Sequence, residues 1–304
     1  MTQNEWHPDV HGGRVAGRAI SIVELIAAGT LDAELAGLLW LLVEARLPMI
    51  VAAAAPRTGK STLLEALLAF LPAGTRRQEL SGFAEDFVWL PEAVELGWQG
   101  NRDANDRLRD RPATPERATR ADPASTYLVA PELSDHLPTY TWGEQARVAV
   151  RAVSRGYGLG ATIHADSLEE VFALLGRPEV GLTAEELSRL GLVLVLRVVP
   201  GEGRRLAAGH YVRPVVRDAG GHIQRLGPAV LATWDPARDA LDHFWWGILP
   251  ELAERTGRPA GDFEAEQARR ASYLAGLVAG GLTGWQEVVA AIAGFRARDP
   301  AGAR

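Results

Sequence analysis

The sequence has no cysteine, and lysine is nearly absent from it. Without cysteine, this chain of 304 residues can form no disulfide frame, no thiolate nucleophile and no cysteine-based metal site. Of its 32 basic side chains, 31 are arginine and one is lysine, Lys60. A codon bias toward arginine explains the split as a whole. The one lysine still merits inspection, because a compact ammonium on a flexible stem and a planar guanidinium serve different chemistry.

Long apolar runs are also missing. The longest, at residues 49–55 and 192–196, fall far short of the roughly 20 residues that a membrane span needs. Residues 1–10 contain Glu5 and Asp9 and no apolar stretch, so we expect no signal peptide. The net charge of −6 argues against a general nucleic-acid coat, although it leaves a local basic groove open. We therefore expect a cytoplasmic protein.

What is present is a pattern typical of an α/β fold. The apolar run 49–55 is short and unalternating, as expected of a strand buried on both faces of a parallel sheet, and a helix is predicted directly after it, at 62–70. A strand, a short loop and a helix in this order begin an α/β fold. Further strands are predicted at 127–130, 161–163 and 193–199, with antiparallel edge strands within 204–245. Further helices are predicted at 21–28, 31–46, 143–155 and 168–175 and from 250 onward, and the polar stretch 99–123 reads as loop or weak helix.

Three of the predicted helices begin with a capping-box pattern. In this pattern a Ser or Thr is followed three residues later by Glu or Gln, and the two side chains satisfy the free N–H groups of the first turn. The pattern places helix starts at Ser167, Thr183 and Thr283.

Lys60 lies between the first predicted strand and its helix. It belongs to the segment Ala54-Ala55-Pro56-Arg57-Thr58-Gly59-Lys60-Ser61, which is the phosphate-binding loop pattern with alanine in place of the first glycine. In such a loop, backbone N–H groups surround phosphate oxygens, the lysine reaches the β- and γ-phosphates, and the serine hydroxyl binds Mg²⁺. The alternative, an accidental Gly-Lys-Ser turn, fits the flanking strand and helix less well. The predicted cofactors are ATP and Mg²⁺, and the predicted binding residues are Arg57, Thr58, Gly59, Lys60, Ser61 and Thr62.

Four further regions of the sequence are similar to segments of one family. They are residues 22–26 with 29–31, residues 120–123 leading into the Walker B-like segment 127–135, the segment 161–167 (Ala-Thr-Ile-His-Ala-Asp-Ser), and the set Glu266, Arg269, Arg270, Leu274 and Asp299-Pro300. Together with the phosphate loop, they resemble the motor domain of the type II and type IV secretion and type IV pilus ATPases. The resemblance covers about residues 21–300, and the segment 161–167, similar to the histidine box of that family, is its most diagnostic part.

The resemblance implies a domain arrangement. We expect an α/β protein with a RecA-like P-loop core at residues 47–248. A short helical N-terminal extension, residues 1–46, would precede it, and a helical C-terminal subdomain, residues 249–304, would follow. Because only 20 residues precede Ser21, the N-terminal domain usual before this motor is expected to be missing.

Two residues are the main candidates for chemistry beside Lys60. Glu132 ends a predicted strand, where a carboxylate would polarise the attacking water and hold hydrated Mg²⁺; the alternative is an exposed strand-end acid. His164 ends the next strand, and the resemblance places it near the γ-phosphate as a sensor or an inter-subunit contact. The alternative for His164 is a core histidine with its hydrogen bonds satisfied.

A third acid is expected between the two Walker motifs. Glu85, followed by Asp86, is the candidate for the family's acidic box, where it would orient water or metal. Glu79 competes for this role, and a plain surface acid is the alternative to both.

The catalytic arginine is hard to select among so many. The resemblance places trans-acting arginine fingers between the acidic box and Walker B, a region that contains Arg102, Arg107, Arg109, Arg111, Arg117 and Arg120. Arg147, Arg151 and Arg155 recur every four residues and so share one helix face. For each arginine the alternative is a solvated surface side chain.

Three residues depart from the family pattern. Pro131 stands where the family usually has glycine, Ser134 where it has arginine, and Tyr157 where it has histidine. These departures concern the finger arrangement and nucleotide clamping more than nucleotide binding itself.

The predicted function is Mg-ATP hydrolysis by a ring-forming, hexameric motor of a secretion or pilus-like system. The motor would act in the cytoplasm or at the inner face of the membrane, with a membrane-embedded platform protein as its partner and without nucleic acid. Two alternatives remain: a nucleotide-binding assembly scaffold with little hydrolysis, which the changes at Ser134 and Tyr157 permit, and a DNA-translocating RecA-like ATPase, which the acidic net charge disfavours.

Overall fold

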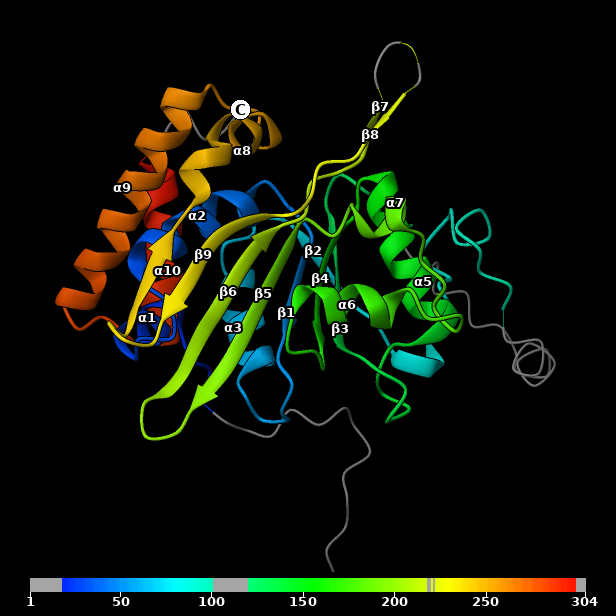
Figure 1. The fold of residues 1–304 in the computed structure, drawn as a ribbon, viewed down its shortest axis with the longest axis horizontal. Helices are drawn as coiled ribbons and strands as arrows, with labels where there is room; N and C mark the ends of the chain where they lie inside the picture. Colours follow the sequence, from blue (N-terminus) through cyan, green and yellow to red (C-terminus); the bar gives the residue numbers. More distant parts are fainter. Residues whose placement is uncertain (1–17, 101–119, 218–219, 221, 299–304) are drawn as a thin grey trace, which may run out of the picture.

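One eight-stranded sheet forms the centre of the fold (Figure 1). The computed structural model describes residues 18–100, 120–217, 220 and 222–298. The strands of the sheet are β1 (Met49–Ala52), β2 (Arg76–Glu79), β3 (Thr126–Leu133), β4 (Gly158–Ile163), β5 (Leu192–Val199), β6 (Gly203–Tyr211), β9 (Ala229–Asp235) and β10 (Ala240–His243). Their order across the sheet is β10-β9-β6-β5-β1-β4-β3-β2.

Five neighbouring strands run parallel, in the order β5-β1-β4-β3-β2. Strand β1 is buried along its whole length, because Ile50 pairs with Ala161 of β4 on one side and with Val193 of β5 on the other. Strand β4 therefore separates β1, which leads into the phosphate loop, from β3, which carries Glu132. This order is that of a RecA-like P-loop fold, so the predicted fold class is confirmed.

The antiparallel strands predicted within 204–245 are present at the edge of the sheet. Strand β6 pairs with β5, β9 with β6, and β10 with β9, all antiparallel. Two short strands, β7 (Val216–Arg217) and β8 (Ile223–Gln224), form a separate ribbon that extends away from the body (Figure 1). At the other edge, strand β2 was not predicted, because three of its four residues are exposed and charged.

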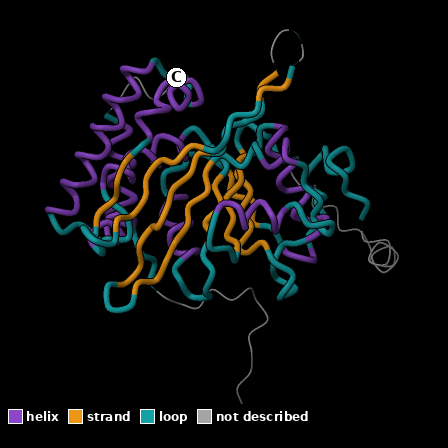
Figure 2. The backbone as a smooth tube through the Cα atoms, viewed as in Figure 1, coloured by secondary structure: helices purple, strands orange, loops and turns teal. Residues whose placement is uncertain are grey.

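Helices cover both faces of the sheet (Figure 2). One face packs against α1 (Ile22–Ala27), α2 (Ala33–Glu44), α3 (Lys60–Leu68), α8 (Leu249–Arg255), α9 (Ala260–Ala279) and α10 (Trp285–Ala297). The other packs against α5 (Gly143–Ala152), α6 (Leu168–Leu175) and α7 (Ala184–Leu187). Single 3₁₀ turns are formed by Gly82–Ala84, Val153–Arg155 and Trp245–Ile248. None of the helices that the structure describes is long and apolar enough to cross a membrane.

The N-terminal and C-terminal helices share a single core around Trp40 of α2. The Trp40 ring is fully buried and stacks on Phe70 at 5.0 Å, and its centroid lies 5.1 Å from that of Phe295 in α10. The guanidinium of Arg270 in α9 lies 4.9 Å from the Trp40 ring and forms an ion pair with Glu44 at the end of α2. The helical segments at the two chain ends therefore pack against each other as well as against the sheet.

Two of the three predicted helix starts are confirmed. The Ser167 hydroxyl accepts a hydrogen bond from Glu170 N–H at the start of α6, and Thr183 with Glu186 forms a complete capping box at α7. The third start is wrong, because α10 begins one residue later, after Gly284, without a side-chain cap.

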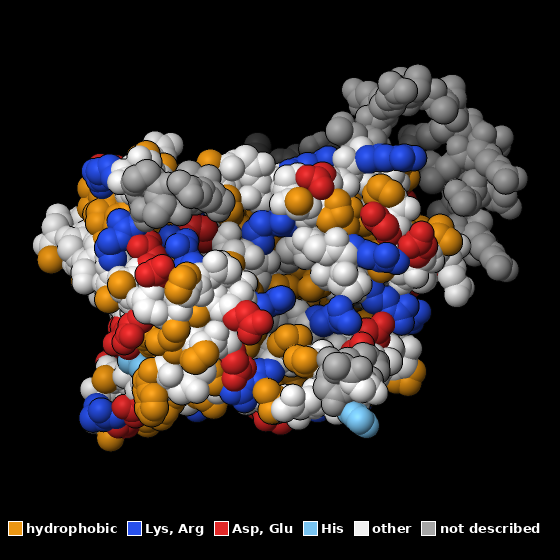
Figure 3. All heavy atoms as spheres, turned by 90° about the horizontal axis from the view of Figure 1, so that it is seen from above, with side chains coloured by type: hydrophobic (Ala, Val, Ile, Leu, Met, Phe, Trp, Pro, Cys, Tyr) orange, Lys and Arg blue, Asp and Glu red, His pale blue; other side chains and the backbone are white. Residues whose placement is uncertain are grey.

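Charges of both signs alternate over the face of the molecule shown in Figure 3. Acidic and basic side chains lie interspersed there, with apolar side chains between them. The view shows no broad area of a single sign of charge on this face.

Candidate nucleotide-binding site

The predicted phosphate loop connects β1 to α3 at the carboxyl end of the parallel strands. The helix begins at Lys60, two residues earlier than predicted, and its N-cap Gly59 has a φ of 96° and no side chain that could accept a hydrogen bond. The first N–H groups of α3 therefore have no side-chain acceptor, which suits an anion at this helix end. Within the loop, the Thr58 hydroxyl donates to the Ala55 carbonyl at 3.0 Å, and the exposed Arg57 adopts a left-handed φ of 59°.

The structure brings Lys60, Glu132 and His164 together. The Lys60 ammonium lies 3.6 Å from Oε2 of Glu132 and 3.3 Å from Nδ1 of His164. Nε2 of His164 lies 3.9 Å from the second oxygen of Glu132, Oε1. The Lys60 and Glu132 side chains are 6% and 8% exposed, whereas that of His164 is 30% exposed. Three residues from separate elements thus form one cluster, with the histidine on its solvent side.

Burial changes the acid–base chemistry of Lys60. Loss of water around the ammonium lowers the pKa of Lys60, and the charge and hydrogen bond of Glu132 oppose this shift in part. An ammonium in such a place interacts strongly with any further negative charge, because few water molecules screen it.

A bulge in β3 orients the Glu132 carboxylate. Strand β3 runs on to Leu133, so Glu132 lies inside the strand and not at its end as predicted. The pairing of β3 with β4 shifts after Ala130, and two residues, Pro131 and Glu132, face the single residue Thr162. The fully buried Thr162 hydroxyl lies 2.8 Å from Oε2 of Glu132 and also within hydrogen-bonding distance of the Pro131 carbonyl. Bulges commonly redirect a side chain beside a functional site.

The residues present fit a Mg²⁺–nucleotide complex. Oε1 of Glu132 is buried without a hydrogen-bond partner, so this acceptor is left unsatisfied by the described residues. Ser61 follows Lys60 and is exposed. Among the described residues, no group of three or more His, Asp or Glu side chains could hold a metal by itself. A Mg²⁺ ion here would therefore take most of its ligands from phosphate and water, as Mg²⁺ usually does.

Glu85 makes all its observed contacts within its own loop. Its carboxylate is buried and accepts hydrogen bonds from the N–H groups of Ser81 and Phe87 and from the Trp89 indole. The structure does not bring Glu85 into contact with the Lys60 cluster. The rival acid Glu79 lies exposed in β2, 3.6 Å from Arg77. The catalytic role of Glu85 stays a prediction.

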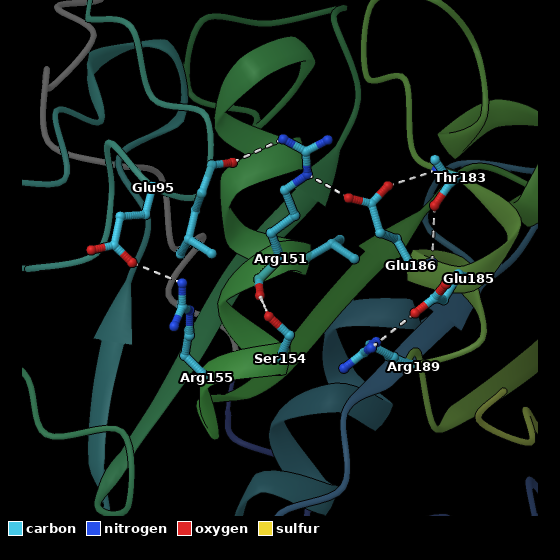
Figure 4. A pocket seen from close by; sticks show the side chains of 10 residues that line it. Glu95, Arg151, Ser154, Arg155, Thr183, Glu185, Glu186 and Arg189 are labelled. Carbon is cyan, nitrogen blue, oxygen red and sulfur yellow. Dashed lines mark hydrogen bonds and ion pairs between the residues drawn. The ribbon is translucent and has the colours of Figure 1, made fainter. Parts of the chain in front are cut away.

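The arginines on α5 and in the turn that follows it bind to their own chain. Arg147 donates to the Glu179 carbonyl, Arg151 forms an ion pair with Glu186, and Arg155 forms one with Glu95. Figure 4 shows the last two pairs in a cavity of about 600 Å³ between α5 and α7. Arg155 follows α5 and lies just before the start of β4, so these pairs belong to the end of the sheet opposite the phosphate loop.

The remaining candidate fingers are mostly outside the described residues. Arg120 is described and exposed, next to the end of a gap. The others lie in the gap: Arg102, Arg107, Arg109, Arg111 and Arg117. Asp299 and Pro300, which contributed to the family resemblance, lie outside as well.

The three departures from the family pattern have structural explanations. Pro131 lies in the bulge, where a missing N–H is tolerated. The Ser134 hydroxyl accepts a hydrogen bond from His136 N–H in the loop after β3. Tyr157 is buried before the start of β4, where its hydroxyl donates to the Ala121 carbonyl, and burial together with Glu92 raises its pKa to about 12. Since His164 follows the end of that strand, Tyr157 lies roughly 20 Å from the cluster.

Comparison with known proteins gives distant similarities. No family model matches the chain. It is 24% identical to the uncharacterized protein MJ1287 of Methanocaldococcus jannaschii over 262 residues, which cover 84% of this chain and 90% of that protein. Among solved structures, it is similar to the VirB11 ATPase of the Brucella suis type IV secretion system in complex with sulphate, at 21% identity and a TM-score of 0.37, over 57% of this chain. It is also similar to the ATPase DotB of Legionella pneumophila, at 14% identity and a TM-score of 0.28, over 76% of this chain. The chain spans about half the length of these two structures, 50% and 55% respectively.

Two residues at the site, Thr162 and Arg204, were not predicted from the sequence as functional candidates. Thr162 is part of the segment 161–167, but nothing in the pattern indicated that its hydroxyl would bind Glu132 across a bulge. Arg204 lies in β6 and reaches the phosphate loop from far along the chain. Its only signal would have been the antiparallel pairing of β6 with β5, the neighbour of β1.

Proposed function

We propose that this chain is an ATPase that binds Mg-ATP at the loop around Lys60 and hydrolyses its γ-phosphate. The observation that carries the proposal is the cluster of Lys60, Glu132 and His164 at the carboxyl end of three parallel strands, with Oε1 of Glu132 unpartnered beside it. A carboxylate with one free oxygen next to a phosphate loop suits the orientation of an attacking water.

Each residue has a distinct part in this reaction. The N–H groups of the loop and the Lys60 ammonium hold the phosphates, and Lys60 also offsets charge that develops on the transferred phosphoryl group. Glu132 orients and polarises the attacking water through Oε1, while Thr162 holds its other oxygen. His164, at the more exposed side of the cluster, would sense the γ-phosphate. Ser61 would hold Mg²⁺, which would supply positive charge to offset that of the phosphates.

We further propose that the ATPase works as a hexameric motor of a secretion or pilus-like system that acts on a membrane-embedded platform. This finer assignment rests on the resemblance of the phosphate loop, the Walker B-like segment and the segment 161–167 to that family. The domain division at residues 46 and 248 is part of the same proposal.

Single-turnover hydrolysis of ATP tests the enzymatic core of the proposal. We expect Lys60→Ala to lose nucleotide binding, and Glu132→Gln to bind ATP but to hydrolyse it about 100-fold more slowly than wild type. Glu95→Gln is the matched control, because Glu95 pairs with Arg155 away from the loop. Equal rates for the wild type, Lys60→Ala and Glu132→Gln would exclude the hydrolytic site. Tight binding with negligible wild-type turnover would favour the scaffold, and stimulation by added DNA would favour the translocase.

A further inference from the structure

Arg204 lies against the phosphate loop of its own chain. Its Nη2 donates to the Arg57 carbonyl at 3.2 Å. Its stem passes over Gly59, because a methyl group built on Gly59 would lie 3.0 Å from Cδ and 3.2 Å from Nε of Arg204. Two independent contacts therefore place one guanidinium beside the loop, although β6 is remote from the loop in sequence.

The Arg204 guanidinium has no acidic partner within the part of the chain that the structure describes. Its side chain is exposed. One N–H group of the guanidinium binds Arg57, and a guanidinium has five. The remaining donors and the full positive charge are thus available to a ligand in the loop.

The adjacent residue shows how this part of the hairpin is held in place. Arg205 is buried, forms a two-bond contact with Asp239 at 2.6 and 2.8 Å, and donates to the Glu202 carbonyl at 2.9 Å. The hydrogen bond to Asp239 raises the pKa of Arg205, so this guanidinium stays charged and paired. Of two successive arginines, Arg205 fixes the β5–β6 hairpin, and Arg204 is held beside the loop by its hydrogen bond to Arg57 without an acidic partner among the described residues, an arrangement that preorganises Arg204.

We propose that Arg204 is a nucleotide-binding residue, which donates charged hydrogen bonds to the triphosphate from within the same chain. The inference rests on the proposed function and adds to it a cation that needs no neighbouring subunit. Arginine suits the role because its planar fork can bind two phosphate oxygens at once, while keeping the Arg57 carbonyl as a fixed support. The φ of 96° at position 59 favours glycine, and the absence of a side chain there also leaves room for the Arg204 stem.

The test separates the charge of Arg204 from its support of the loop. Arg204→Lys keeps the charge, Arg204→Gln keeps a donor for the Arg57 carbonyl without charge, and Arg204→Ala removes both. The measurements are the equilibrium affinity of the purified full chain for a fluorescent ATP analogue, and its displacement by inorganic tripolyphosphate and by adenosine. Arg238→Ala is the control, because Arg238 pairs with Asp235 and Asp242 on another turn.

We expect Arg204→Gln and Arg204→Ala to weaken binding of both the ATP analogue and tripolyphosphate by about tenfold or more, and Arg204→Lys by less. Adenosine affinity should change less than twofold in all three variants, and Arg238→Ala should match the wild type. If Arg204→Gln binds the ATP analogue as tightly as the wild type does, Arg204 only supports the loop and the inference is overturned. If the wild type binds neither ATP analogue nor tripolyphosphate, the proposed function fails and the inference with it. If every Arg204 variant binds the ATP analogue as the wild type does while Lys60→Ala does not bind it, the inference about Arg204 is wrong and the proposed function stands.

Discussion

At the scale of single residues, the site depends on how the two oxygens of Glu132 are used. Oε2 faces both the Thr162 hydroxyl and the Lys60 ammonium, whereas Oε1 has no hydrogen-bond partner. A carboxylate held firmly by one oxygen cannot rotate freely, so its free oxygen points in a fixed direction. This division between a fixed and a free oxygen is what a water-orienting acid needs.

Thr162→Val tests this division of roles. The substitution preserves shape and removes the hydroxyl, so Glu132 loses one of the two contacts that hold Oε2. We expect single-turnover hydrolysis to slow by about tenfold or more, because small misplacements of a reacting group are costly. Nucleotide affinity should stay within about twofold of wild type, since Thr162 does not reach the loop. Unfolding in denaturant should show a loss of about 1–2 kcal/mol, because the buried acceptor that receives the Thr162 proton loses its donor.

Thr162→Ser is the matched control for this prediction. It loses a methyl group but keeps the hydroxyl, so its single-turnover rate of hydrolysis should be close to that of the wild type. A threonine needed only for packing would give the opposite order, with the valine variant active and the serine variant impaired.

At the scale of elements, the sequence could predict what is decided locally. The apolar run of β1, the loop and helix α3 follow one another directly, so periodicity and motif spacing were sufficient. Glu132 and His164 were also expected at the ends of two successive strands, and parallel strands end at one edge of a sheet. The bulge at Pro131, the closed hydrogen bonding of Glu85 and the approach of Arg204 could not be foreseen. The bulge depends on an irregular pairing register, and Arg204 meets backbone that is remote in sequence. The contacts of Glu85 are local, but they form in an irregular loop that has no periodic pattern to predict them from.

A histidine connects the edge of the sheet to the start of helix α2. Nε2 of His243 in β10 lies 2.8 Å from Asp32, the N-cap of α2, and Nδ1 lies 3.7 Å from Glu34. The side chain is 13% exposed. Burial opposes protonation of His243, but the hydrogen bond of Asp32 and the charges of Asp32, Glu34 and Asp242 outweigh it and raise its pKa.

This contact predicts a pH-dependent contribution to stability. Because the folded pKa of His243 is raised, its contribution is fully present below the unfolded value of about 6.5 and is lost as the pH rises through the folded pKa. His243→Gln keeps a donor for Asp32 but carries no charge. We expect its deficit in the free energy of unfolding to be about 1 kcal/mol near pH 6 and to shrink toward about pH 9. Denaturant unfolding at several pH values measures this, with the exposed His136→Gln as control. A deficit that grows with pH would contradict the assignment.

At the scale of the whole molecule, the N-terminal helix α2 and the C-terminal helices α9 and α10 share one core. Helix α2 contacts α9 and α10 through Trp40, and the buried Arg270 bridges Glu44 of α2 and Glu266 of α9. Removing one partner of a buried ion pair is strongly destabilising, because the other charge is left uncompensated. Arg270 and Glu266, which contributed to the family resemblance, thus have a structural use in this chain, remote from the Lys60 cluster in contacts.

The number of arginine and lysine side chains that this chain itself places at the site affects whether subunits should assemble into a ring. Lys60 faces Glu132, and Arg204 has no acidic partner among the described residues. Arg147, Arg151 and Arg155 are bound within the chain, the last two at the other end of the sheet. If a neighbouring subunit completes the site with a further arginine, bound triphosphate stabilises the assembled state by its additional contacts there. Nucleotide should therefore shift the chain from smaller species toward a ring.

The Glu132→Gln variant offers the sharpest test of ring assembly, because it should hold ATP without consuming it. We expect light scattering to give the mass of six 32.7 kDa chains with Mg-ATP, and a smaller mass without nucleotide or for Lys60→Ala. The measurement should be made at several protein concentrations, because association follows mass action. A single-chain mass under all conditions would exclude a finger from a neighbour. Hydrolysis that persisted in such a monomer would leave the arginine of β6, within the same chain, as the cation that serves the phosphates beside Lys60.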